Sequence, residues 1–183
     1  MRREKKKGSR SIIVVIFLGI LCLGPDPLQA AAPKGVLRQA LHAALSADWL
    51  DPATNGGLGV STNLPLYLLH DALIKAMPEG LYTPCLAESW SISPDSKVYE
   101  FKLRRGVKFH NGDTMTAEDV VFSFNRYKST QAKFIHGKTE KIEIINPYLV
   151  RIHFKEAFPD FPEYMAPGVS AIGWVVPKKY LER

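Results

Sequence analysis

A run of polar residues between two apolar stretches is the part of this 183-residue chain that could do chemistry. It reads "LRRGVKFHNGDTMTAEDVVFSF", from Leu103 to Phe124, and places Asp113 three residues after His110. A histidine and a carboxylate at this spacing could exchange a proton in acid–base catalysis or supply ligands to a metal ion. One hypothesis is therefore a hydrolase or a metal-binding domain that uses His110 and Asp113.

Local structure accounts for the same residues without any reaction. Asn111-Gly112 is typical of a tight turn, because both residue types tolerate a positive φ. Thr116, followed by Glu118 and Asp119, is typical of a helix start, where a hydroxyl and carboxylates satisfy free backbone N–H groups. A metal ion needs three or four converging ligands, and a hydrolase needs a nucleophile that this stretch lacks. We therefore favour a turn and a capped helix, with no catalytic and no metal-binding residue.

The rest of the chain contains none of the common catalytic or cofactor motifs. It has no Gly-rich phosphate loop, no G-x-S-x-G, no H-E-x-x-H and no C-x-x-C. Cys85 lies between Pro84 and the apolar Leu86, which favours a buried and inert thiol over a nucleophile. We predict that the protein is not an enzyme and uses no cofactor.

The first 32 residues have the composition of a secretory signal peptide. A basic start is followed by the uncharged run Ile12–Leu23 and by the small residues Ala30, Ala31 and Ala32. The apolar run is shorter than the roughly 20 residues that span a membrane, so an uncleaved anchor is the less favoured alternative. Bulky residues precede Cys22, which argues against a lipid anchor. We predict export by the Sec route to the periplasm.

Removal of this segment changes the charge balance. The whole chain has a net charge of +6, but residues 1–32 hold six basic and two acidic residues, which leaves 18 basic against 16 acidic ones. A nucleic-acid partner would need a clustered basic surface, so the sequence gives it little support. Cys85 is then the one remaining cysteine, and no intramolecular disulfide can form.

Hydrophobic periodicity predicts an α+β arrangement after the signal peptide. The helical spacing of leucines predicts a helix over Pro65–Ala76 with Asn63 as its N-cap. Alternation of apolar and charged residues predicts a β-hairpin over Ala87–Leu103, with a turn at Ser93–Ser96. The other predicted elements are a strand at Gly35–Ala40, a loop over Ser46–Asn63, a short strand at Val107–Phe109, a helix from Thr116 to about Tyr127, a second hairpin over Lys141–Phe154, a short helix within 159–166 and an apolar strand-like run that Pro177 ends.

The segment from Leu86 to Lys128 resembles the bacterial extracellular solute-binding proteins of family 5, the dipeptide- and oligopeptide-binding components of ABC importers. The resemblance rests on "LAESW", "SPD", "YEFKLR", "GVKFHNG" and "TAEDVVFS" in that order. "LDPA" at Leu50–Ala53, "HDALI" at His70–Ile74 and "GWVVPKKYLE" at Gly173–Glu182 are also similar to the family. The resemblance covers nearly all of the chain after the signal peptide.

This resemblance implies a fold and a division into domains. The fold is α/β, the periplasmic-binding-protein-like (type II) fold of two lobes with an inserted small α+β domain. Residues 33–62 and 170–183 would belong to the first ligand-binding lobe, and residues 63–169 to the inserted domain. Family members are much longer, so we expect this chain to be an N-terminal portion that is truncated before the second lobe.

The resemblance also implies a function. The protein would capture peptides or similar small solutes in the periplasm and deliver them to ABC permease subunits in the inner membrane, acting as a monomer. Asp48, Trp49 and Trp174 lie in the two stretches assigned to the ligand-binding lobe. Because aromatic walls with a few polar groups suit such pockets, we predict that these three residues contact the ligand. The ligand itself could be a peptide, a nickel complex, haem, a sugar or an opine.

Overall fold

The computed structural model describes residues 35–36, 50–54, 60–166 and 172–183. The chain divides into two compact units, residues 1–40 and residues 41–183. Of the first unit only Gly35 and Val36 are described, so everything below concerns the second. The predicted signal peptide and most of the predicted strand at Gly35–Ala40 lie outside the described residues.

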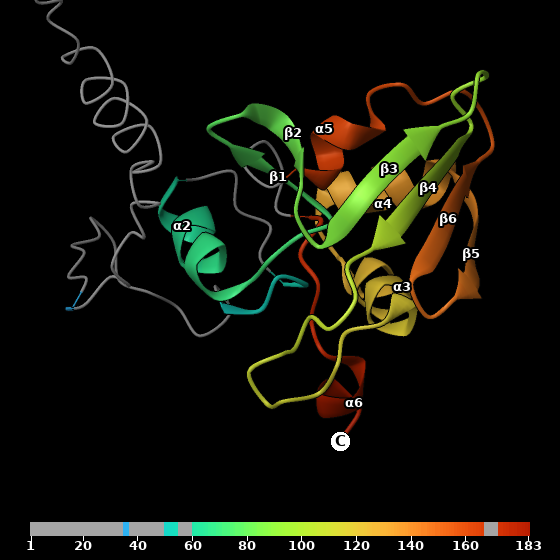
Figure 1. Cartoon of the computed structure of the whole chain (residues 1–183). Helices are drawn as coiled ribbons and strands as arrows, with labels where there is room; N and C mark the ends of the chain where they lie inside the picture. The colour runs from blue at the N-terminus through green and yellow to red at the C-terminus, as the bar shows by residue number, and fades with distance from the viewer. Residues whose placement is uncertain (1–34, 37–49, 55–59, 167–171) are drawn as a thin grey trace, which may run out of the picture. The chain divides into compact units, whose positions relative to one another are not determined.

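A four-stranded antiparallel sheet forms the centre of this unit (Figure 1). Both predicted hairpins are confirmed. They join along β4 (Val98–Leu103) and β6 (Leu149–Phe154), where Tyr99 lies opposite Ile152. The turn of the first hairpin closes with a 2.9 Å hydrogen bond from Ser96 N–H to the Ser93 carbonyl. In spatial order the strands are β3 (Ala87–Ile92), β4 (Val98–Leu103), β6 (Leu149–Phe154) and β5 (Thr139–Asn146).

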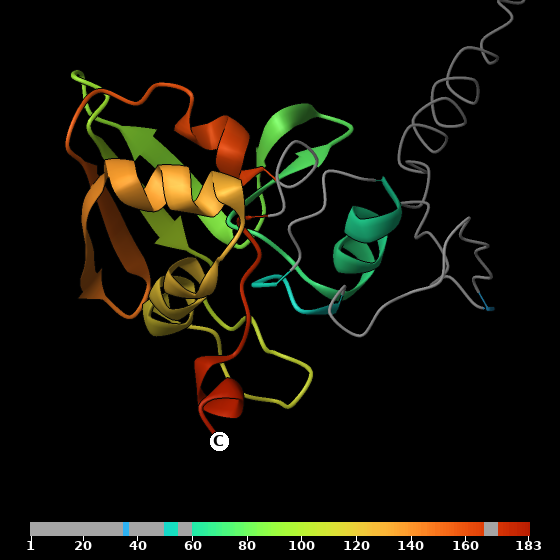
Figure 2. The ribbon, with the colours of Figure 1, turned by 180° about the vertical axis from the view of Figure 1, so that it is seen from behind.

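The helices cover one face of this sheet, as Figure 2 shows from behind. They are α3 (Ala117–Arg126), α4 (Thr130–Lys138) and α5 (Phe161–Met165). Alternation along β4 and β6 turns every second side chain toward them, so Phe101, Val150 and Ile152 are buried. Phe161 of α5 completes this core, with its ring centroid 5.0 Å from that of Tyr99.

The opposite face of the sheet carries cross-strand charge pairs. Arg151 Nε lies 2.6 Å from Glu100 Oε2, and His153 Nε2 lies 3.0 Å from Glu143 Oε2. His153 therefore points away from the core, as expected from the alternation of sides along β6, where its neighbours Ile152 and Phe154 are buried. These pairs fix the register on the polar face while the aromatic residues fix it on the other.

The predicted capped helix is confirmed in α3. Asp119 occupies the third helical position, and its Oδ2 accepts the Thr116 N–H at 2.8 Å and the Thr116 hydroxyl at 3.2 Å. These bonds satisfy a backbone donor that the helix cannot satisfy itself. The predicted turn before the helix is also present, closed by a 2.9 Å bond from Gly112 N–H to the Phe109 carbonyl. Of its two expected positive-φ residues only Gly112 has one, with φ of 88°.

The predicted helix over Pro65–Ala76 is wrong in its bounds. Helix α2 covers Val60–Leu69, so Asn63 lies inside it and is no N-cap, and the predicted loop ends before Val60. The residues after His70 form β1 (Ile74–Met77), which pairs with β2 (Gly80–Pro84). The leucine spacing suits a helix, but the backbone around Ala72 pairs with Leu86 and with Trp174. Tertiary pairing overrides local propensity here.

Two smaller predictions also differ from the structure, and one helix was not predicted. The expected strand Val107–Phe109 is a single bridge between Lys108 and Thr114. The apolar run before Pro177 likewise makes one bridge, at Trp174, and ends before the short helix α6 (Lys178–Leu181). Helix α4 was not predicted, although Ser129 caps it by accepting the Ala132 N–H at 3.1 Å.

Within the described residues, no helix combines the length and the apolar character needed to cross a bilayer.

Candidate functional site

Trp174 is the one predicted ligand residue that the structure describes, and it is fully buried. Its backbone forms an antiparallel bridge with Ala72, which holds it against the end of α2. The Tyr67 ring meets the indole edge-on, with centroids 5.0 Å apart, and the His70 ring lies 6.4 Å away. Asp48 and Trp49 lie outside the described residues.

The edge of this aromatic cluster contains a buried cation that sequence reasoning missed. Lys75 is 9% exposed, and its ammonium lies 4.9 Å from the centroid of Tyr67 and 5.5 Å from that of Trp174. Asp71 neutralises it through a 2.9 Å ion pair. Such a cation over two ring faces fixes both rings. The sequence did contain a sign of this burial. Lys75 lies inside the apolar run "ALIKAM", where a strand would place its side chain among buried residues.

The indole nitrogen of Trp174 has no partner among the described residues. Nε1 is buried, yet no described acceptor lies within hydrogen-bonding distance. An unpaired buried donor costs about 1–3 kcal/mol, so proteins usually supply an acceptor. The Trp174 indole is therefore a candidate donor to a group outside the described residues.

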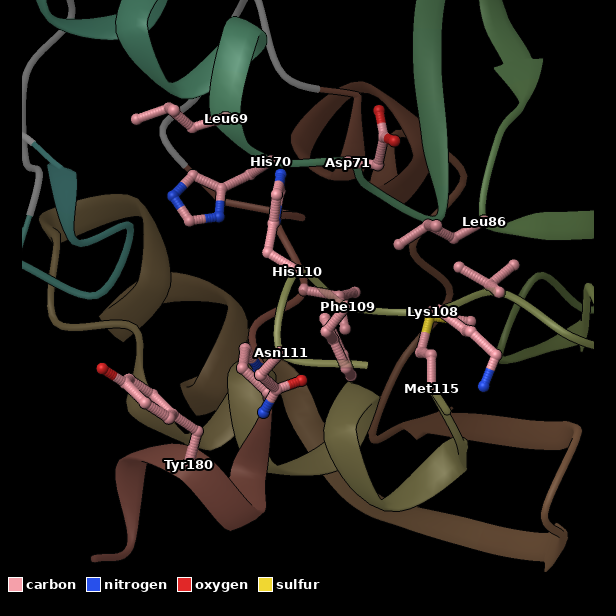
Figure 3. Close-up of a pocket in the computed structure, with 13 residues that line it drawn as sticks. Leu69, His70, Asp71, Leu86, Lys108, Phe109, His110, Asn111, Met115 and Tyr180 are labelled. Atoms are coloured by element: carbon pink, nitrogen blue, oxygen red, sulfur yellow. The ribbon is translucent and has the colours of Figure 1, made fainter. Parts of the chain in front are cut away.

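A cavity of about 420 Å³ lies beside this cluster (Figure 3). Its volume falls within the range of small-molecule sites, about 300–1,000 Å³. Its walls come from the end of α2, from the loop before α3 and from the segment that follows Trp174. Its lining is mainly apolar with several polar groups: Leu69, His70, Asp71, Leu86, Val107, Lys108, Phe109, His110, Asn111, Met115, Val175, Pro177 and Tyr180.

His70 connects the cavity to the turn that follows Trp49 in the sequence. Its Nε2 lies 3.1 Å from the carbonyl oxygen of Leu50. A carbonyl can only accept, so Nε2 carries the hydrogen and Nδ1 is left as an acceptor in the neutral ring. Burial lowers the pKa of His70 below its ordinary 6.5, and the nearby His110 lowers it further, against the opposing effects of the Leu50 carbonyl, Asp51 and Asp71.

This lowered pKa predicts a pH dependence of stability. The unfolded chain takes up a proton near pH 6.5, whereas the folded chain resists protonation of His70 until lower pH. The free energy of unfolding should therefore fall as the pH drops from 6.5 through the lowered pKa. Urea titrations between pH 7.5 and pH 5 measure it. His70→Gln keeps an N–H donor but cannot take up the proton, so its free energy of unfolding should depend less on pH than that of the parent. The control His153→Gln, on the sheet face, should keep the pH dependence that His70 causes. An equal pH dependence in His70→Gln and the parent would contradict the prediction.

The described part of the predicted long loop is a turn fixed on α3. Asp51 Oδ2 lies 2.8 Å from Arg126 Nη2, and Asp51 Oδ1 lies 3.3 Å from Nη1. The Lys128 N–H donates to the Ala53 carbonyl at 3.2 Å. This Leu50–Thr54 turn comes directly after Asp48 and Trp49 in the chain, so α3 holds the point at which that stretch enters the described fold.

The same helix holds the segment that carries Trp174. The Tyr127 hydroxyl donates to the Trp174 carbonyl, and the Val176 N–H donates to Ser123 Oγ at 2.9 Å. Asp119 Oδ1 accepts the Lys178 N–H at 2.9 Å. Burial raises the pKa of the Tyr127 hydroxyl far above its ordinary value, so the donor keeps its hydrogen. Helix α3 and its C-cap residue Tyr127 thus hold both the Leu50–Thr54 turn and the backbone from Trp174 to Lys178.

His110 and Asp113 do not form a reactive pair in the structure. His110 is exposed at the turn, and Asp113 Oδ2 accepts a 2.9 Å bond from the Asn111 side-chain amide. No group of three or more potential metal ligands occurs among the residues that the structure describes. Asn111 and Asp113 form part of the hydrogen-bonded turn before α3. The comparisons that follow do not favour the hydrolase and metal-binding hypothesis.

Comparison with known protein families identifies the class to which the chain belongs. Residues 82–181 match the model of the bacterial extracellular solute-binding proteins, family 5, middle part. This match covers more than half of the chain, which therefore belongs to that family.

Individual relatives and solved structures agree with this assignment. Di/tripeptide-binding protein 2 of Pseudomonas aeruginosa is 33% identical over 154 residues, which are 71% of this chain and 28% of that protein. Among solved structures, the binding protein AgaA of A. tumefaciens R10 with agropinic acid has a TM-score of 0.63 at 27% identity, over 73% of this chain and 27% of that one. Haemophilus influenzae OppA with the peptide RPPGFSPFR gives 0.61 at 26% identity, over 74% and 29%. The chain thus spans less than a third of the length of these relatives.

Proposed function

We propose that this protein is the substrate-binding component of an ABC importer and captures peptides or similar small solutes. The observation that carries the proposal is the family match over residues 82–181, together with relatives that are named as peptide-binding proteins. The two solved neighbours named above contain agropinic acid and the peptide RPPGFSPFR, so the fold accommodates both.

The proposed ligand-side residues are Asp48, Trp49 and Trp174. Trp174 does not itself line the cavity, but its buried indole N–H has no described acceptor and its ring centroid lies 6.4 Å from that of His70, which does line it. An aromatic ring buries much apolar surface on binding, and a carboxylate such as that of Asp48 would pair with the ammonium of a peptide. Asp71 is neutralised by Lys75, which leaves Asp48 as the proposed anionic contact.

The proposed mechanism is closure of two lobes around the solute. A ligand that bridges both lobes favours the closed form through contacts that exist only in that form. We propose that residues 33–62 and 170–183 contribute to the first lobe and that residues 63–169 form the inserted domain. The bridge between Ala72 and Trp174 supports a rigid connection between these two parts.

Export to the periplasm is part of the proposal, because the relatives include a periplasmic oligopeptide-binding protein. Residues 1–32 would be removed as a signal peptide, and the protein would meet its permease subunits at the inner membrane as a monomer. N-terminal sequencing of exported protein tests this directly. A start near Ala32 is expected, and a start at Met1 in exported material would contradict cleavage.

A binding assay tests the function itself. In a protein that contains both proposed lobes, isothermal titration calorimetry with an equimolar dipeptide mixture, with RPPGFSPFR and with agropinic acid should detect binding of at least one class. Trp49→Phe and Trp174→Phe should weaken that binding about tenfold, or about 1.4 kcal/mol. Trp90→Phe, which alters a ring packed on the sheet, should bind like the parent. Absence of binding in all three classes, or full affinity in both site variants, would overturn the proposal.

A further inference from the structure

Helix α2 packs on the rest of the unit through a small apolar cluster of its own. This α2 cluster consists of the buried residues Leu66, Ala72 and Trp174, and it is separate from the larger core of the sheet and its helices. Tyr67 packs against it, whereas Leu68 of the same helix is 60% exposed. An element that buries so few apolar side chains can open locally at a lower free energy than the main core.

Lys75 supplies a cation at the C-terminal end of this helix. Its Nζ lies 3.4 Å from the carbonyl oxygen of Tyr67 and 3.5 Å from that of His70. The last carbonyls of a helix have no partner within the helix and carry partial negative charge, so a cation beside them stabilises the helix end. The shorter 2.9 Å bond to Asp71 Oδ1 holds the ammonium in this place.

The same ammonium faces both aromatic rings at this end of α2. It lies 4.9 Å from the centroid of Tyr67 and 5.5 Å from that of Trp174, within the range at which a cation is attracted to a ring face. The Lys75 side chain is 11% exposed, so solvent screens these contacts little, whereas Asp71 is 56% exposed and its ion pair is screened in part. Loss of the charge on Lys75 would remove the carbonyl contacts and the ring contacts together.

The end of α2 is also one wall of the cavity beside Trp174. Leu69, His70 and Asp71 line it together (Figure 3). Leu69 is the last residue of α2, and the Asp71 carbonyl accepts the Val175 N–H at 2.9 Å, next to Trp174. The position of the α2 end relative to Trp174 therefore sets the shape of this wall.

We infer that Lys75 is a positioning residue of the solute site: it holds the end of α2 against Trp174 and so fixes the cavity wall formed by Leu69–Asp71. This inference rests on the proposed function in assigning Trp174 and the cavity beside it to the solute. The convergence of one buried ammonium on two backbone carbonyls, a carboxylate and two aromatic rings carries it.

Hydrogen exchange of the full chain, followed by NMR, tests the inference without a ligand. The indole nitrogen of Trp174 is buried, so its hydrogen exchanges only when the α2 cluster opens. In the parent this hydrogen should exchange faster than the Ile152 amide, because the cluster opens while the sheet stays folded. Lys75→Met keeps the length of the side chain and removes its charge, and it should accelerate the Trp174 exchange about tenfold or more.

A contact between two rings reports on position directly. The Tyr67 and Trp174 centroids are 5.0 Å apart, close enough for a nuclear Overhauser contact between their ring hydrogens. This contact should weaken in Lys75→Met. Lys75→Arg keeps a cation at the site and should restore most of it, which a loss of charge-independent packing would not predict.

Lys138→Met is a matched control at the end of α4. Lys138 pairs with Glu156, and its ammonium lies 5.1 Å from the centroid of Phe134 and 5.3 Å from that of Phe158. This variant therefore loses the same kinds of contact in a different part of the unit. It should leave the exchange of the Trp174 indole hydrogen unchanged.

Two results would overturn the inference. One is a parental exchange rate of the Trp174 indole hydrogen in Lys75→Met. The other is an equal acceleration in Lys138→Met, which would mean that this hydrogen exchanges only when the whole unit unfolds. If Lys75→Met does not fold, Asp71→Asn, which removes the charge partner of Lys75, decides by the same criteria.

Titration with the dipeptide mixture, with RPPGFSPFR and with agropinic acid, in the protein that contains both proposed lobes, is a further readout. Lys75→Met should weaken the affinity for the solute that the parent binds about tenfold, which corresponds to about 1.4 kcal/mol. If the parent binds and the variant binds equally well, the role of Lys75 at the solute site is refuted. If the parent binds none of the three while the Trp174 exchange still responds to Lys75, the positioning of α2 holds and the proposed function fails.

Discussion

Replacement of Gly173 by alanine is expected to unfold the chain or to weaken it severely. Gly173 has a φ of +102°, which side-chain-bearing residues rarely adopt, and an added Cβ would lie 2.4 Å from the carbonyl oxygen of Met165. The backbone strain costs about 1–3 kcal/mol and forced overlap with a packed neighbour costs a similar amount, so we expect a loss of about 3 kcal/mol or more. Urea unfolding followed by far-UV circular dichroism measures it.

Gly137→Ala is the matched control and should have the opposite sign. Gly137 lies exposed in α4, and nothing lies within 4 Å of a Cβ placed there. Alanine is favoured over glycine in a helix by about 1 kcal/mol, so this variant should be slightly more stable than the parent. A Gly173→Ala variant with parental stability would show that Met165 moves away at little cost. The position matters for function because Gly173 directly precedes Trp174.

Phe101→Ala should cost about 3–5 kcal/mol, the usual range for removal of a buried phenylalanine ring. Phe101 lies within β4 and has no exposed surface. Its ring centroid lies 6.4 Å from that of Trp90 and 6.4 Å from that of Phe161. Its loss leaves a cavity that a sheet covered by helices cannot close. Equilibrium unfolding in urea gives the free energy, and Trp90 fluorescence reports the local change.

Lys102→Ala, one residue further along the same strand, is the control for this second prediction. Lys102 points to the opposite face, where it pairs with Glu88 at 3.3 Å and both side chains are more than half exposed. Exposed pairs contribute about 0–1 kcal/mol, so the stability should change little. Similar losses in the two variants would mean that the helices do not bury this face in solution.

The two glycine variants and the two β4 variants together distinguish the stability of the sheet from that of the segment that leads into Trp174. Phe101 reports on the sheet and its helices, whereas Gly173 reports on the segment that leads into Trp174. If Gly173→Ala abolishes solute binding at a temperature where the sheet is still folded, the proposed ligand stretch can be disturbed on its own. Near-UV circular dichroism at that temperature distinguishes the two cases.

The elements that the sequence predicted well are those whose stabilising contacts are local. Both hairpins carry a sequence period of two over much of their length, although the pairing shifts register near Ala87, Thr139 and Ile144. They close through short turns, and their bounds were predicted closely. The start of α3 was predicted because Thr116 and Asp119 lie three residues apart and satisfy each other. Recognition of the family also came from this stretch, since its motifs are contiguous.

The errors arose where distant segments compete with local preference. The leucines between Pro65 and Ala76 have helical spacing, but the strand-like pairing of Ala72 with Leu86 and Trp174 depends on residues far along the chain. A single sequence shows no sign of such pairing. Helix α4 was missed for a simpler reason, because Ala132 and Ile135 give it only a short apolar stripe.

The amino-acid sequence by itself determined the family, the alternating strands, the capped helix and the tight turn at Asn111–Gly112. Only the tertiary structure brought together Arg126 with Asp51 and Lys75 with Trp174, pairs that are 75 and 99 residues apart. The physical reason is that side-chain periodicity records which face of an element is buried, while the partner on that face depends on how the whole chain closes.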